Sequence, residues 1–259
     1  MAAKVGVWIL ALGVWAGCAG NRAGTAAPTP PGVALLDRMR SKYVGKWFKT
    51  VTFSQQTIQK RPTGVVDTST WYEALKSPDR LRIDFGDPKN GNGVIYTADS
   101  LYVIRSDTIA RTVASGNPFL PFVAGVYAQP LDTTLKQIGV YKFDLTKSYK
   151  TTYQGHPAYV VGSTSERDTL SPQFWVDGEK LVVVRMLVAL NPNAPTDVAD
   201  IRLDDYRKVG GGWLAVHVAI MRGGEVIQRE DYADWRGDVE LPDDFFVAQM
   251  WGKVPHWHR

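Results

Sequence analysis

The chain has 259 residues, of which 44% are hydrophobic and 22% are charged. This composition is typical of a folded protein with a sizeable core and excludes global disorder. The net charge of +4 is modest for this length, and the basic residues are scattered among acidic ones. The charge therefore gives no reason to expect a nucleic-acid partner.

The first residues predict export. Lys4 supplies a positive start, residues 5–14 form a short apolar run, and Ala16 and Gly17 precede Cys18, the single cysteine. The pattern resembles a bacterial lipoprotein signal, which implies that a signal peptide of residues 1–17 is removed and that Cys18 is lipidated. An ordinary signal peptide or a membrane anchor with an incidental cysteine remains the alternative.

Residues 18–32 are expected to be the lipidated cysteine and a flexible linker rich in alanine, glycine and proline. Residue 19 is alanine and not aspartate, which by resemblance to enterobacterial lipoprotein sorting favours the outer membrane. We expect a lipid anchor at the periplasmic face of the outer membrane, followed by a single domain over residues 33–259.

The domain begins with a predicted amphipathic helix, residues 33–43, and continues mainly as strands separated by tight turns. In residues 80–85 the side chains alternate strictly between apolar and charged. This pattern predicts a strand with one buried face and one wet face. The apolar face has Leu81, Ile83 and Phe85, and the wet face has Arg80, Arg82 and Asp84.

Residues 173–186 predict a β-hairpin. Two runs rich in aromatic and β-branched residues flank Asp177-Gly178, a dipeptide that suits a two-residue turn. With that turn, Phe174 and Val183 share one face and Trp175 lies on the other. Both faces are apolar, so the hairpin is expected to be covered on both sides.

A helical insert is predicted at about residues 117–138, among the strands. Asn117 is a good N-cap and Pro118 suits the first helical position. The following apolar residues have helical spacing and would suit a lid or a plug over a concave sheet. They are Phe119, Phe122, Val123, Val126 and Tyr127. Two interpretations remain: the insert is a lid that moves, or it is a helix that closes the core permanently.

Tight turns and few helices favour a mainly β fold, with a strongly curved antiparallel sheet or incomplete barrel whose concave face short helices cover. Motifs for nucleophilic, metal or nucleotide chemistry are not found in the sequence. We predict no catalytic residue, no metal site and no cofactor. Carboxylates from distant strands could still form a hydrolase site.

Several segments together resemble the LolA- and LolB-like superfamily of periplasmic lipoprotein carriers and receptors, which includes the outer-membrane lipoprotein-sorting proteins. These segments are residues 53–57 (FSQQT), 77–85 (SPDRLRIDF), 174–177 (FWVD) with 181–185, and 241–246 (LPDDFF). The resemblance covers residues 33–247. It implies a half-barrel of about eleven strands with helices lidding an apolar cavity for acyl chains.

By this resemblance we expect a lipid-anchored, non-enzymatic protein that binds acyl chains of lipoproteins or other lipids for sorting or transfer. The expected cavity and lid residues are Leu81, Ile83, Phe85, Phe119, Phe122, Val123, Val126, Tyr127, Phe174 and Val183. The alternatives are an envelope sensor or scaffold on the same fold, and a carboxylate-dependent hydrolase.

Overall fold

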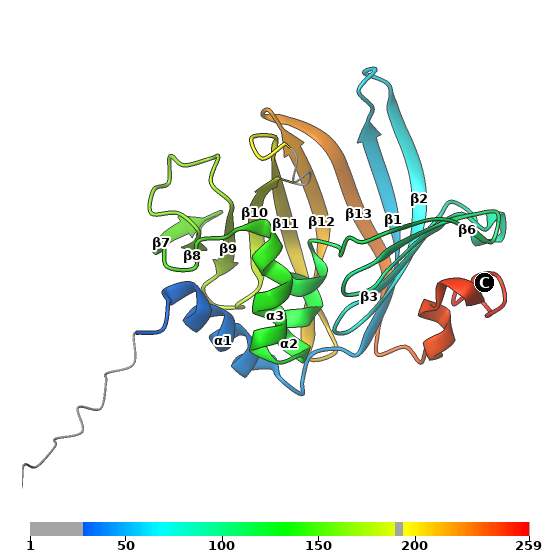
Figure 1. Cartoon of the computed structure of the whole chain (residues 1–259), viewed down its shortest axis with the longest axis horizontal. Coiled ribbons are helices and arrows are strands. Elements are labelled where there is room, and N and C mark those ends of the chain that lie inside the picture. The colour runs from blue at the N-terminus through cyan, green and yellow to red at the C-terminus, as the bar shows by residue number, and fades with distance from the viewer. Residues whose placement is uncertain (1–27, 190–193, 259) are drawn as a thin grey trace, which may run out of the picture.

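One continuous antiparallel sheet dominates the computed structural model, which describes residues 28–189 and 194–258 (Figure 1). Within these residues the sheet has thirteen strands, in the order β6-β5-β4-β3-β2-β1-β13-β12-β11-β10-β9-β8-β7. The outermost strands, β6 and β7, lie at opposite edges, so the sheet is an open half-barrel. The predicted fold class is confirmed, with thirteen strands in place of about eleven.

The strands form two meanders. The first comprises β1 (Thr50–Lys60), β2 (Val66–Lys76), β3 (Arg80–Phe85), β4 (Gly93–Tyr96), β5 (Leu101–Arg105) and β6 (Thr108–Val113). The second comprises β7 (Ser148–Tyr153), β8 (His156–Val161), β9 (Gln173–Asp177), β10 (Val183–Ala189), β11 (Val198–Val209), β12 (Gly212–Arg222) and β13 (Glu225–Gly237). The meanders join where the first strand pairs with the last.

The helices lie mainly on one side of this sheet (Figure 1). They are α1 (Pro31–Tyr43), a π-helical turn (Pro121–Gly125), α2 (Val126–Ala128) and α3 (Leu131–Ile138). Short 3₁₀ helices occur at Pro88–Asn90, Gly139–Tyr141, Asp243–Phe246 and Ala248–Met250. In the described residues, none of the helices has the length and apolar character needed to cross a membrane.

The topology explains where the helical insert lies. Strands β6 and β7 follow each other along the chain but occupy opposite edges of the sheet. The segment between them, which contains the π-helical turn, α2 and α3, must therefore cross the sheet from edge to edge. It crosses on the concave face, where it packs against α1 and the strands.

The predicted insert begins later than expected. The Asn117 Oδ1 accepts a hydrogen bond of 2.8 Å from the Phe119 N–H, which forms a turn ahead of the helix, and Leu120 occupies the N-cap position. In a helix begun at Pro118, however, Pro121 would have to donate to the Asn117 carbonyl, and proline has no N–H to donate. The regular turns therefore start around Pro121, which occupies the first turn of the helix.

The two-residue turn predicted for the 173–186 hairpin is wrong. Residues 178–182 connect β9 to β10, and Asp177 Oδ1 accepts from the backbone N–H of Glu179 and Lys180 at 2.9 and 2.5 Å. The turn is stabilised by these side-chain bonds, so Asp177 organises a longer loop. The expectation that both faces are covered is confirmed, because every residue of β9 is buried.

The wet face predicted for β3 is wrong for Arg82 and Asp84, whereas Arg80 is exposed. Arg82 and Asp84 are only 3% and 0% exposed, because the C-terminal segment covers the convex face of β3. Their side chains form a bidentate ion pair with N–O distances of 2.8 and 2.9 Å. The Arg82 guanidinium lies 3.7 Å from the ring centre of Trp251, and His256 Nε2 lies 3.1 Å from Asp84 Oδ2.

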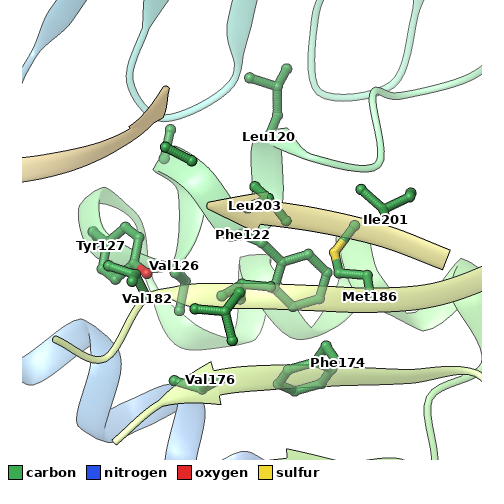
Figure 2. Close-up of a cluster of buried hydrophobic side chains, with 14 of the residues drawn as sticks. Leu120, Phe122, Val126, Tyr127, Phe174, Val176, Val182, Met186, Ile201 and Leu203 are labelled. Atoms are coloured by element: carbon green, nitrogen blue, oxygen red, sulfur yellow. The ribbon is translucent and has the colours of Figure 1, made fainter. Parts of the chain in front are cut away.

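The main core lies between the concave face and the helices. Figure 2 shows Phe122 of the insert among side chains of the strands, near Phe174 and Met186. The ring centres of Phe122 and Phe174 are 5.0 Å apart, and all three of these side chains are fully buried. The insert is therefore part of the core as well as a cover.

Candidate functional site

A cavity of about 310 Å³ lies between the helical insert and the concave face of the sheet. Its walls come from β1 to β4, from β11 to β13, from the segment preceding β1 and from the insert. Most lining residues are aliphatic or aromatic. An apolar, partly enclosed space with a few polar groups is the usual form of a small-molecule site.

Seven of the ten predicted cavity residues line this space. They are Leu81, Ile83, Phe85, Phe119, Phe122, Val123 and Tyr127. The other three, Val126, Phe174 and Val183, are fully buried in the core and do not line it. The predicted lipidation site, Cys18, lies outside the described residues.

The two ends of the insert differ in how they are held. Tyr127 is buried, stacks on Trp47 with ring centres 3.7 Å apart, and donates a hydrogen bond of 3.0 Å to the Leu181 carbonyl. Phe119 and Val123, nearer the start of the insert, are only half-buried. Between these two positions Leu120 and Phe122 are buried, so Phe119 and Val123 are half-buried positions in a segment that is otherwise packed into the core.

Aromatic residues on the strands contribute more of the lining than the sequence reasoning anticipated. Trp71 packs against Phe85 with ring centres 4.7 Å apart, and Phe53 stacks on Tyr232 at 4.3 Å. Trp213 also lines the cavity. Strand tryptophans usually belong to the core, so the sequence did not distinguish Trp71 and Trp213 as residues that line the cavity.

Two acidic residues in the cavity wall were not predicted. Glu73 of β2 and Glu230 of β13 are 5% and 8% exposed. The Tyr232 hydroxyl donates to Glu230 Oε2 at 2.8 Å, and Gln228 Nε2 donates to Oε1. No hydrogen bond or ion pair joins the Glu73 carboxyl to any residue that the structure describes. The signal in the sequence was that Glu73 has apolar neighbours, Trp71 and Leu75, on the same face of its strand.

Burial governs the protonation of both acids. It raises the pKa of Glu73 well above its usual range, and the nearby Glu230 raises it further. Burial also raises the pKa of Glu230, while the hydrogen bonds from Tyr232 and Gln228 act in the opposite direction. Among the described residues that line the cavity there is no lysine, arginine or histidine, so none of these residues compensates a negative charge there.

Among the described lining residues there is also no serine, threonine, cysteine or histidine, and the titratable groups are carboxyls and tyrosine hydroxyls. Across the described part of the chain, no group of three or more metal-ligating side chains is found. The arrangement suits binding of an apolar chain with one polar group near the two carboxyls.

An open antiparallel half-barrel with a helical insert over an apolar cavity defines the class of this protein. No family model matches the chain, and no curated protein matches it. Solved structures do match. A DUF1329 family protein from Desulfovibrio piger is 16% identical with a TM-score of 0.60, over 86% of this chain and 100% of that one.

Two further matching structures have descriptions that identify the fold. A domain from Vibrio parahaemolyticus, described as an outer membrane lipoprotein-sorting protein, is 11% identical with a TM-score of 0.56, over 85% of this chain and 97% of that one. A LolA superfamily protein from Nitrosomonas europaea is 14% identical with a TM-score of 0.52, over 85% and 98%. The chain has a LolA-like fold, as the sequence resemblance implied.

Proposed function

We propose that this protein binds an acyl chain of a lipoprotein or of another lipid in the cavity beneath the helical insert, for lipoprotein sorting or lipid transfer. The observation that carries the proposal is the apolar, aromatic-lined cavity of about 310 Å³ that the insert covers. The LolA-like fold and its likeness to a lipoprotein-sorting domain support it.

Binding of this kind needs no chemical step. Each methylene moved from water into the cavity contributes about 0.8 kcal/mol. Transfer then follows from differences in affinity between this cavity and the donor or acceptor, and a small change in how deeply the chain enters is enough to release it.

The size of the cavity limits what enters it. Small-molecule sites span about 300–1,000 Å³, so a volume of about 310 Å³ suits one chain. A lipid with several chains requires the insert to move.

The proposed location is the periplasmic face of the outer membrane, with a lipid on Cys18 as the anchor. Support comes from the sequence alone, namely the apolar run, the small residues before Cys18 and the alanine that follows it. In the same proposal, residues 1–17 are removed and residues 33–259 form one lipid-binding domain with no role for a metal or cofactor.

The test is native mass spectrometry with lipid extraction, on the domain of residues 28–259, exported without the anchoring Cys18 and purified from the envelope without detergent. Phe119→Asp places a charge in the cavity wall at a half-buried position and should reduce the co-purified acyl ligand at least tenfold. Tyr102→Asp, a half-buried position outside the cavity, is the matched control and should retain it. Equal loading of the two folded variants would contradict the proposal.

A second candidate is an envelope sensor or scaffold that recognises partners through its surface. The observation that favours it is the way Tyr127 is held by Trp47 and the Leu181 carbonyl, which suits a fixed insert. A wild-type protein that carries no acyl ligand and takes none up from acylated peptide would favour this candidate over the first.

Hydrolysis by the two acids is the weakest candidate. A glycosidase needs one ionised carboxylate beside one protonated acid, whereas burial raises the pKa of both Glu73 and Glu230. The lining offers few polar groups to hold a sugar. The two acids are better explained as ligand-binding groups.

A further inference from the structure

The Glu73 carboxyl is an unusual group to find in a cavity wall. Its neighbours across the sheet are Phe53 of β1 and Ile83 of β3. The side chain is more than nine-tenths buried, and none of the described residues gives it a hydrogen bond or an opposite charge. The carboxyl opens onto the cavity, so a molecule in the cavity has to supply its partner, and a ligand with a matching polar group can do so.

The surroundings of Glu73 favour a positively charged partner. Glu230 is the second acid of the cavity, and its orientation is fixed by bonds from Tyr232 and Gln228. None of the described residues that line the cavity is basic, so none of them neutralises either acid. A fatty-acid carboxylate or a phosphate placed here would face two acids and no cation.

The aromatic side chains in the cavity wall also favour a positively charged ligand. Trp71 and Trp213 line the cavity on the sheet side, and Phe119 lines it from the insert. The faces of such rings attract cations, most strongly where water is excluded. Carboxyl groups combined with aromatic walls form a suitable pocket for an ammonium group.

We propose that the cavity prefers amphiphiles with a basic amine headgroup, paired with the Glu73 carboxyl, over alcohols and over anionic amphiphiles such as fatty acids. This inference rests on the proposed function, because it names the headgroup of the chain that the cavity binds. Glu230 contributes to the negative potential but already has its own hydrogen-bond partners.

Protons balance in the binding step. When an ammonium enters, the Glu73 carboxyl releases its proton to solvent; when a neutral amine enters, that proton passes from the carboxyl oxygen to the amine nitrogen. Both routes end in the same ammonium–carboxylate pair. The other titratable groups in the cavity wall are Tyr96, Tyr127, Tyr206, Glu230 and Tyr232, and none of them brings a positive charge.

The proton balance determines in which direction the affinity for an amine changes with pH. Binding of the ammonium form releases one proton while the unliganded Glu73 carboxyl is protonated, so the affinity for an amine should rise with pH up to the pKa of Glu73 and fall once the amine itself loses its charge. The raised pKa of Glu73 moves this rise above the range of an exposed glutamate. The affinity for an alcohol of the same length should not change over that range.

The experiment uses the full-length protein and displacement of an uncharged, pyrene-labelled dodecanol at pH 8. Dodecylamine, dodecanol and dodecanoate have chains of equal length and differ in headgroup. We expect dodecylamine to bind at least tenfold more tightly than dodecanol, and dodecanoate to bind most weakly. In Glu73→Gln the preference for the amine should fall to about twofold or less while dodecanol binding is kept.

Two further measurements make the test decisive. Glu240→Gln makes the same chemical change at an exposed position outside the cavity and should keep the amine preference. If Glu73→Gln does not fold, Glu230→Gln and the pH profile of wild-type binding replace it. Equal binding of the three ligands, or tightest binding of dodecanoate, overturns the inference and leaves acyl binding intact. A probe that does not bind the wild-type protein overturns both.

Discussion

Glu73 is the residue whose environment has the clearest measurable consequence. In the unfolded chain its carboxyl would ionise near the ordinary value of 4.5, whereas burial raises its pKa in the folded protein. The folded state therefore binds more protons than the unfolded state above that value. The stability that this difference provides is full below about pH 4.5 and is lost as the pH rises toward the folded pKa.

Replacing Glu73 by glutamine should therefore stabilise the protein, and more so at high pH. The amide keeps the shape of the side chain and has no charge to bury. We expect the gain in Tm over wild type to be at least about 2 °C larger at pH 8 than at pH 5. Thermal unfolding of both proteins at the two pH values measures this.

The difference between the two proteins reports Glu73 together with its coupling to Glu230, which also raises the pKa of Glu73. Glu240→Gln, at an exposed position, should show no such pH-dependent gain. A gain for Glu73→Gln that is equal at the two pH values would mean that the carboxyl is not desolvated in solution.

At the scale of elements, strand β3 shows what periodicity reveals and what it omits. The alternation in residues 80–85 identified the side that carries Leu81 and Ile83, which line the cavity. It also suggested a wet face, because charged residues alternate with apolar ones. The structure buries most of that face under the C-terminal segment, where Arg82 contacts Phe245 and Trp251.

The burial of Arg82 predicts a large effect of its removal. Arg82→Ala would leave Asp84 buried without its ion-pair partner and remove the contacts with Phe245 and Trp251, at a cost of about 3–5 kcal/mol. Arg80→Ala, at an exposed position on the same strand, should cost less than about 0.5 kcal/mol. Urea unfolding compares the two variants, and similar midpoints would show that the C-terminal segment does not cover β3.

The helical insert and the hairpin show where prediction from the sequence pattern fails because of local hydrogen bonding. The apolar spacing from Phe119 to Tyr127 located the insert, but Pro121 shifted its start and a π-helical turn replaced regular helix. Asp177-Gly178 located the hairpin, but hydrogen bonds to the Asp177 side chain favoured a longer connection. Such side-chain bonds compete with the backbone turn in ways that the dipeptide alone does not reveal.

For the whole molecule, the resemblance and the strand pattern predicted the half-barrel, but not the pairing that defines its centre. Strands β1 and β13 are far apart in the sequence and pair directly, with Gln55 opposite Tyr232. This pairing places Glu73 of the first meander and Glu230 of the last strand in one cavity. No local pattern reports a contact at such separation, so the two acids were missed as a pair.

The same topology explains why the cavity is covered. The chain leaves the sheet at one edge strand and re-enters at the other, so the insert crosses the concave face between them. Phe119 and Phe122 on this crossing segment line the cavity opposite the strands. The single connection between β6 and β7 thus forms one wall of the cavity and also covers it.

The central claim is that an acyl chain occupies this cavity, and photo-crosslinking tests it most directly. A fatty alcohol with a diazirine at mid-chain would be bound to the full-length protein, irradiated and mapped by peptide mass spectrometry. We predict labels in residues 81–85 and 119–123, which line the cavity from opposite sides, and their loss when unlabelled dodecanol competes. Labels confined to the outer surface, or labels that dodecanol does not displace, would contradict the account.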